Sequence, residues 1–213
     1  DLTIKDGDLI AATQGRSFWV LYDLSLLHQW DKNITAQNFH LFRPCDTWRQ
    51  NSYKYDRSNA GQNPNSDLVI TYYLKNIADS ASNLKIEIMD TTLKTIKSYS
   101  PKASKESEKL KPKKGLNQMS WDMHYADAEK FEGMILWNGD LSGPMAPPGN
   151  YYVKMVCGKD SVIQMFRLKK PTNIEASDAD LKAQFDLSLK IRDQLSEVNK
   201  TVEKIRSIRN QMN

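Results

Sequence analysis

The chain has 213 residues, of which 39% are hydrophobic, and 30 Lys and Arg residues against 26 Asp and Glu residues give a formal net charge of +4. This length and composition allow a buried core in one large or two modest domains. The basic residues are spread along the chain apart from a lysine-rich stretch near 102–114, so the charge does not indicate nucleic-acid or membrane binding. No apolar run approaches the roughly 20 residues that span a bilayer.

Residues 1–25 predict a β-hairpin. The stretch IAATQGRSFWVLY at 10–22 contains two apolar runs around a short polar segment, in which Gly15 allows the positive φ of a tight turn. Residues 2–4 and the turn-like 5–8 precede it. Because a lone hairpin is marginal in water, we expect this one to join a sheet.

Residues 26–66 are predicted to form a linker or a long ordered loop. Residues 24–30, at its start, favour a short helix, and residues 39–42 favour a short strand that ends before Pro44. Residues 46–65 contain three aromatic side chains, Trp48, Tyr53 and Tyr55, among polar ones without any periodicity, which is typical of a loop.

Residues 67–170 show the pattern of an antiparallel β-sandwich, because alternating strands bury one face and two such faces can pack together. The expected strands are 68–74, 84–88, 93–99, 116–123, 151–156 and 161–168, the last two joined by a turn at Gly158-Lys159-Asp160. The stretch PKASKESEKLKPKK at 101–114 can bury little apolar area, and we expect a mobile loop there.

Residues 177–213 predict a long α-helix that Ser177 or Asp178 can cap. From Ile191 onward the apolar rhythm is close to a heptad, which predicts a narrow seam that a partner buries. The sandwich, another subunit or a further helix are the partners that the sequence leaves open. The residues of this interaction seam are Ile191, Leu195, Val198, Val202 and Ile205.

The chemistry-bearing residues form no catalytic signature, and we assign no catalytic residue. Cys45 and Cys157 lie far apart, and the sequence does not decide whether they pair. The three histidines lack metal-ligand spacing, so we expect no histidine-based metal site, and we assign no metal ligand and no cofactor. Calcium stays open, since residues 6–8 and 56–65 offer oxygen ligands outside any EF-hand loop.

Sugar binding is the main functional alternative in the residues themselves. Asp122, Glu132 and Asp140 lie near Trp121 and Trp137, and glycoside hydrolysis needs two carboxyl groups roughly 5–10 Å apart. The same residues also fit a structural role, with Trp121 in the core and 137–140 in a turn. The candidate carbohydrate-binding residues are Trp137, Trp48, Tyr53, Tyr55 and Asp140.

Four stretches carry a resemblance to one group of proteins. GRSFWVLYDLS at 15–25 resembles the closing strand of the last blade in bacterial β-propellers built from BNR-like repeats, a group often labelled glycosyl hydrolase or sortilin-like. Three further stretches resemble successive landmarks of the C-terminal region of those proteins, where they bracket an immunoglobulin-like or fibronectin-like sandwich followed by helices. They are GQNPNSDLVITYYLK at 61–75, FEGMILWNGDLSGPMAPPGNYYVKM at 131–155 and DLKAQFDLSLKIRDQLSEVNKTVEKIRSIRNQ at 180–211.

The resemblance implies a mainly β fold with an immunoglobulin- or fibronectin-like sandwich at 67–170, an N-terminal hairpin from a propeller blade at 1–25 and a C-terminal helix at 177–213. The sequence begins with Asp1 and not with Met, and the resemblance implies that the rest of the blade lies upstream of it. The implied function is a non-catalytic C-terminal accessory module of a periplasmic or extracellular glycoside-hydrolase-like protein. This module would support the propeller and mediate interdomain or protein–protein docking.

A carbohydrate-binding module is the alternative, and part of a glycosidase is a second one. The expected partners are the upstream propeller of the parent chain, a second copy through the C-terminal helix, and a polysaccharide. We expect neither nucleic acid as a partner nor a membrane span.

Overall fold

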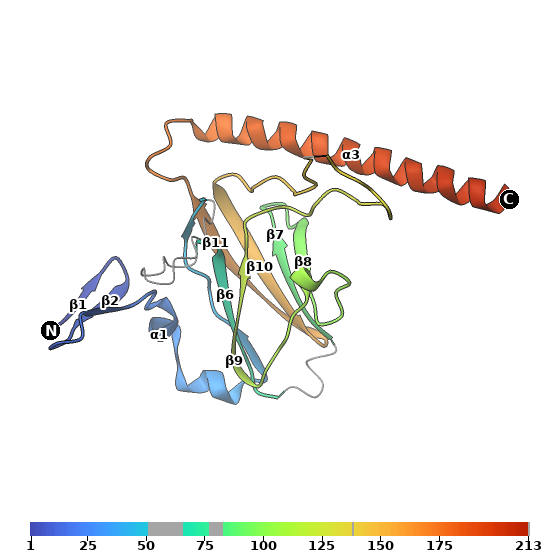
Figure 1. Ribbon diagram of the computed structural model, residues 1–213. Coiled ribbons are helices and arrows are strands. Elements are labelled where there is room, and N and C mark those ends of the chain that lie inside the picture. The colour runs from blue at the N-terminus through green and yellow to red at the C-terminus, as the bar shows by residue number, and fades with distance from the viewer. Residues whose placement is uncertain (51–65, 77–82, 138, 213) are drawn as a thin grey trace.

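A computed structural model describes residues 1–50, 66–76, 83–137 and 139–212, and Figure 1 shows its architecture. The protein is mainly β, with 35% of its residues in the strands of three sheets, and has one long C-terminal helix. This arrangement confirms the predicted β-rich fold with a long helix and is consistent with a β-sandwich.

Two of the sheets face each other and enclose the core. Their neighbouring strands are antiparallel, except that β5 pairs with β11 in parallel. The five-stranded sheet has the order β5 (Thr47–Trp48), β11 (Asp160–Lys169), β10 (Gly149–Cys157), β7 (Leu84–Met89) and β8 (Thr95–Tyr99). The three-stranded sheet has the order β4 (Phe39–Leu41), β6 (Leu68–Leu74) and β9 (Gly115–Trp121).

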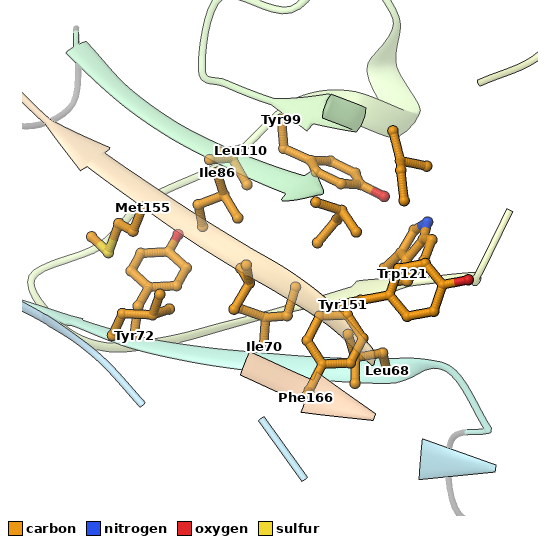
Figure 2. Close-up of a cluster of buried hydrophobic side chains, with 14 of the residues drawn as sticks. Leu68, Ile70, Tyr72, Ile86, Tyr99, Leu110, Trp121, Tyr151, Met155 and Phe166 are labelled. Atoms are coloured by element: carbon orange, nitrogen blue, oxygen red, sulfur yellow. The ribbon is translucent and has the colours of Figure 1, made fainter. Parts of the chain in front are cut away.

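The core forms because alternate side chains of each strand point between the sheets. Three aromatic side chains pack together at one end of the core, as Figure 2 shows. The centroid of the Trp121 ring lies 6.0 Å from that of Tyr151 and 6.1 Å from that of Phe166. The Trp121 indole N–H donates to the carbonyl oxygen of His124 at 2.8 Å, so its polar atom is satisfied inside the core. Other fully buried core residues are Leu68, Ile70, Leu74, Ile86, Ile88, Val153 and Met155.

The strands expected between 68 and 168 are all present, and no end differs from its expected position by more than two residues. One of the two-residue differences is at β8, which begins at Thr95 instead of residue 93. Leu93 has a φ of 62° in the preceding turn, and the Asp90 carboxylate accepts hydrogen bonds from the Thr92 and Lys94 amides. Residues 93 and 94, which the sequence pattern assigned to the strand, therefore belong to the turn.

The lysine-rich stretch 101–114 is anchored to the core. It contains a 3₁₀ helix, η2 (Glu106–Glu108), and its single leucine, Leu110, is only 6% exposed. The Leu110 amide also donates to the carbonyl oxygen of Ser100 at 3.1 Å. We expected a mobile loop because a single leucine buries little apolar area, whereas the Leu110 side chain belongs to the buried core cluster.

The N-terminal residues form a separate sheet that projects from the sandwich in Figure 1. Its strands are β1 (Leu2–Lys5), β2 (Asp8–Ala12) and β3 (Phe18–Leu21), in that order. The predicted hairpin is confirmed as β2–β3, and β1 adds a third strand. A short helix, α1 (Ser25–Gln29), and a 3₁₀ helix, η1 (Lys32–Ala36), then lead into the sandwich.

The C-terminal helix is α3 (Asp178–Met212), which runs along one end of the sandwich and extends beyond it (Figure 1). Ser177 caps it as expected: its hydroxyl accepts from the Asp180 amide at 3.1 Å and donates to the Asp180 carboxylate at 2.6 Å. Leu181 and Phe185 are buried at its start, where the Phe185 ring lies 4.7 Å from that of Tyr125.

Candidate functional site

The N-terminal sheet carries an apolar face on which no polar side chain lies. Residues that pair across neighbouring strands point to the same side of a sheet, so Leu2 shares a face with Ala11 and Trp19. Ile4 shares it with Leu9 and Leu21 by the same register. We call this the blade face: Leu2, Ile4, Leu9, Ala11, Trp19 and Leu21.

The described residues leave most of the blade face uncovered. Leu2, Ile4, Trp19 and Leu21 are 73%, 66%, 64% and 52% exposed, and the opposite face exposes Phe18 to 76%. Such a sheet has no hydrophobic core of its own, and exposed contiguous apolar patches commonly mark interaction sites. Its link to the following chain is polar: the Leu24 amide donates to the carbonyl oxygen of Gly7 at 2.8 Å.

Trp48 lies in an open pocket of about 600 Å³ on the edge of the sandwich. It is 44% exposed and pairs with Lys169 on β11, whose ammonium nitrogen lies 5.5 Å from the centroid of the Trp48 ring. Three cations and a single carboxylate line the pocket, which makes it basic. The lining residues are Trp48, Pro148, Gly149, Arg167, Leu168, Lys169, Lys170, Ser177 and Asp178.

Trp137 is in a different place. It is 94% exposed in the long connection between β9 and β10, next to Ile135 at 84%, and it does not line the Trp48 pocket. Asp140 accepts from both the amide and the hydroxyl of Ser142, at 2.9 and 2.7 Å. These hydrogen bonds, above all the one from the hydroxyl, hold the pKa of Asp140 below its usual range, which is the behaviour of a turn residue.

The structure therefore separates the candidate carbohydrate residues. Trp48 lines a pocket, Trp137 does not line that pocket, and Asp140 stabilises a turn. Tyr53 and Tyr55 lie outside the described residues.

Of the other two acidic residues considered for glycoside hydrolysis, Asp122 uses its carboxylate in local contacts, and Glu132 makes a contact through its backbone. Asp122 pairs with Lys97 at 3.2 Å, and its carboxylate also accepts from the His124 amide at the same distance. The backbone carbonyl of Glu132 accepts from Arg206 at 2.7 Å. None of Asp122, Glu132 and Asp140 lines the Trp48 pocket, so that pocket does not hold the paired carboxylates of a glycosidase.

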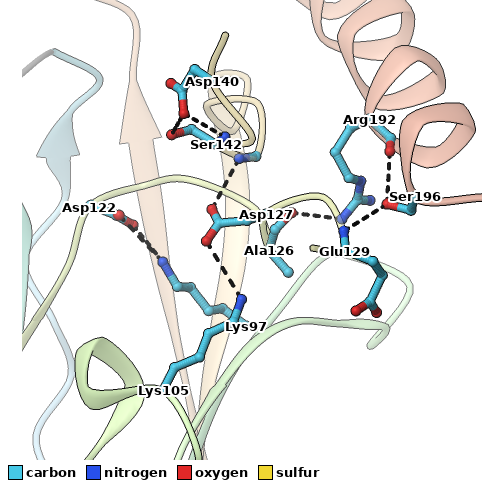
Figure 3. A network of polar contacts seen from close by, with 11 residues as sticks. Lys97, Lys105, Asp122, Ala126, Asp127, Glu129, Asp140, Ser142, Arg192 and Ser196 are labelled. Carbon is cyan, nitrogen blue, oxygen red and sulfur yellow. Dashed lines mark hydrogen bonds and ion pairs between the residues drawn. The ribbon is translucent and has the colours of Figure 1, made fainter. Parts of the chain in front are cut away.

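The helix α3 is attached mainly by polar side chains that hold the backbone of residues 126–132 (Figure 3). Arg192 donates to the carbonyl oxygen of Ala126 at 2.7 Å, and the buried Asn199 donates to that of Glu129 at 2.6 Å. The Ser196 hydroxyl accepts from the Glu129 amide at 3.1 Å. After its first turns, the docked face of the helix thus includes these polar side chains beside half-buried apolar ones.

The predicted interaction seam divides between two sides of the helix. Leu195 and Val202 are half-buried, whereas Ile191, Val198 and Ile205 are 60%, 59% and 61% exposed. Sequence periodicity predicted the apolar residues but not this division, because it does not detect the polar residues Arg192, Ser196 and Asn199, which share the docked face.

Cys45 and Cys157 are both free thiols. The Cys45 thiol donates to the Asp23 carboxylate at 3.1 Å, and burial raises its pKa. Over the described ranges, no group of three or more His, Cys, Asp or Glu side chains is placed to hold a metal ion.

Sequence reasoning missed the basic lining of the Trp48 pocket and the extent of the blade face. Arg167 and Lys169 alternate on one strand, which is a visible signal, but their approach to Trp48 depends on the parallel β5–β11 pair. A two-residue strand has no periodicity to detect. The extent of the blade face could be predicted only with the pairing register of β1 against β2, and the sequence pattern did not provide that register.

No family model, no curated protein and no solved structure matches this chain. Among the helices that the structure describes, none is both long and apolar enough to cross a membrane.

Proposed function

We propose that this chain is a non-catalytic accessory module that docks onto a larger β-structured body through its blade face. The observation that carries the proposal is the exposure of that face: Leu2, Ile4 and Trp19 are each more than 60% exposed, at 73%, 66% and 64%. Burying a large apolar side chain contributes about 1.5–3 kcal/mol, so covering the face would stabilise both partners.

The resemblance supplies the identity of that body. Trp19 and Leu21 of the blade face lie in the segment 15–25 that resembles the closing strand of a propeller blade, and further strands of such a blade would pack against the face. On this proposal the sandwich is immunoglobulin- or fibronectin-like and braces a glycoside-hydrolase-like propeller outside the cytoplasm. The polar link between the sheet and the chain at Asp23 and Leu24, ahead of α1, supports docking of the sheet as a separate unit.

Hydroxyl-radical footprinting tests the docking proposal. The oxidation rate of Trp19 is measured in the 213-residue chain and in the protein isolated from its native source, with Trp137 as an internal control. We expect Trp19 to be oxidised several times more slowly in the native protein, while Trp137 changes little. Equal oxidation of Trp19 in the two samples would contradict the proposal.

A second candidate function is the binding of an acidic polysaccharide at the Trp48 pocket. An exposed indole can stack on a sugar ring, and Arg167, Lys169 and Lys170 can neutralise carboxylate or sulfate groups. The basic lining favours an acidic over a neutral sugar.

Calorimetric titration with oligogalacturonate, compared with a neutral cello-oligosaccharide, tests this candidate. We expect the acidic ligand alone to bind, and Trp48→Ala to weaken it about tenfold, which corresponds to about 1.4 kcal/mol. Trp137→Ala serves as the matched control and should leave binding unchanged. Binding that survives Trp48→Ala, or no binding of the acidic ligand, would exclude this pocket.

A further inference from the structure

The helix α3 presents an apolar stripe that the described part of the chain leaves uncovered. Ile191, Val198, Ile205 and Met212 recur every seven residues and occupy one position of a heptad, conventionally a. Leu187 and Ile208 occupy position d, three residues after a, and Gln194 and Thr201 fill the remaining d positions. The six apolar members of this outer stripe are exposed: Leu187 61%, Ile191 60%, Val198 59%, Ile205 61%, Ile208 57% and Met212 81%.

The outer stripe points away from the sandwich. Arg192, Asn199 and Arg206, which hold residues 126–132, each follow an a residue by one position. A helix turns by about 100° per residue, so these side chains leave the helix on a different side from the stripe. A second helix can therefore approach the stripe without displacing the contacts that attach α3.

We propose that the outer stripe pairs with the same stripe of a second copy, forming an antiparallel two-stranded coiled coil. In such a coil each a residue faces a d residue of the other helix. A two-fold axis between Asn199 and Lys200 places every a residue opposite a d residue over the whole stripe. The layers are Leu187 with Met212 of the second copy, Ile191 with Ile208, Gln194 with Ile205, and Val198 with Thr201, each occurring twice.

Charge complementarity selects this orientation. In the antiparallel register, Glu197 on the flank of the stripe faces Lys204 of the second copy, and the reverse pair forms across the axis. In a parallel coil, Lys204 would face Arg209 of the second copy and Glu197 would face Val202. The parallel form would thus place Lys204 beside Arg209, which repel each other, whereas the antiparallel form has two ion pairs between Glu197 and Lys204.

The half-buried residues of the predicted seam fit the same register. Leu195 of one helix faces Val202 of the other beside the stripe, so both would lose their remaining exposure on dimerisation. Gln194 and Thr201 are polar members of the layers, and such residues fix register at a cost in stability. The dimer is accordingly expected to dissociate on dilution. This interface is independent of the docking proposed for the blade face.

Sedimentation equilibrium of the full chain over a dilution series tests self-association. We expect a reversible dimer, which Ile205→Asp abolishes and Ser207→Asp preserves. The two substitutions add the same charge to the same helix, but Ser207 lies outside the stripe. A monomeric wild-type chain would overturn the proposal, as would a dimer that Trp19→Asp abolishes and Ile205→Asp does not, because that dimer would use the blade face.

A charge exchange tests the orientation. Glu197→Lys and Lys204→Glu should each weaken the antiparallel dimer severalfold, and the double variant should restore it, because the exchanged charges face each other again. In a parallel dimer, Lys204→Glu would instead strengthen association by facing Arg209. Strengthening by Lys204→Glu, or failure of the double variant to recover, would overturn the antiparallel register.

Discussion

Trp121 and Trp137 are two tryptophans of one region with opposite environments. Trp121 has no exposed surface and packs against Tyr151 and Phe166, whereas Trp137 is 94% exposed. Trp121 also satisfies its indole N–H through His124, so its replacement removes both packing and a hydrogen bond.

Replacing these residues should have very different effects on stability. Trp121→Ala is expected to lower the free energy of unfolding by about 3–5 kcal/mol, because a large cavity forms in a closely packed core. Trp137→Ala should change it by less than about 0.5 kcal/mol. Urea denaturation followed by circular dichroism measures both, and equal losses would contradict the assignment of Trp121 to the core.

Tyr72 predicts how stability depends on alkaline pH. Burial raises its pKa to about 12 in the folded chain, from an ordinary value near 10. In the unfolded chain Tyr72 therefore loses its proton at a lower pH than in the folded chain. Its contribution to stability is complete below pH 10 and is lost progressively as the pH rises towards 12.

The variant Tyr72→Phe removes this titrating group. We expect its stability, relative to its own value at about pH 8, to fall less between pH 10 and 12 than that of the wild-type chain. Other buried tyrosines, such as Tyr99 and Tyr151, still titrate in the variant, so the fall is reduced and not abolished. Identical pH profiles would show that Tyr72 ionises as easily in the folded state as in the unfolded state.

At the scale of the elements, α3 is held to the sandwich by side chains that satisfy backbone groups of an irregular segment. Residues 126–132 contain no strand, so their carbonyl and amide groups need partners outside a sheet. Arg192, Ser196, Asn199 and Arg206 provide them, and the Arg206 guanidinium also lies 4.7 Å from the Phe131 ring centroid. The helix thus orders the segment, and the segment positions the helix.

Asn199 is the buried member of this attachment, at 3% exposure. Asn199→Ala leaves the carbonyl oxygen of Glu129 without its donor, which costs about 1–3 kcal/mol. We expect faster hydrogen–deuterium exchange in residues 126–132 and in the C-terminal half of α3, with the strands of the sandwich unchanged.

Asn210→Ala is the matched control for Asn199→Ala, because Asn210 is an exposed asparagine of the same helix that lies outside both the attachment and the outer stripe. Its exchange in residues 126–132 should equal that of the wild-type chain. If the two variants exchange alike, the attachment of α3 does not depend on Asn199.

At the scale of the whole molecule, periodicity could predict the elements but not how they meet. The strands of the sandwich and α3 follow from alternation and from spacings of three and four, because burial of one face imposes these periods. The Trp48 pocket is lined by residues of β5, the start of β10, the end of β11 and the start of α3, and β5 lies far from the others in the sequence. The side of α3 that docks could not be read from hydrophobicity either, since polar residues make that contact.

The core cluster indicates which part of the molecule folds independently. It draws its residues from both sheets of the sandwich and includes Leu110, but neither Leu181 nor Phe185 of α3 belongs to it. The helix adds contacts to Tyr125 and to residues 126–132, which lie at one end of the sandwich. Removing α3 therefore exposes part of this end and leaves the central packing intact.

A chain that ends before Ser177 should accordingly remain folded. We expect a cooperative urea transition at a lower midpoint than that of the full chain, because the contacts of Leu181 and Phe185 are lost while the core around Trp121 is retained. The near-ultraviolet circular dichroism of the aromatic core should persist, and the truncated chain should be monomeric, because it lacks the outer stripe. A truncated chain without a cooperative transition would place α3 within the folding unit. A truncated chain that still dimerised would instead locate self-association in the N-terminal sheet or the sandwich.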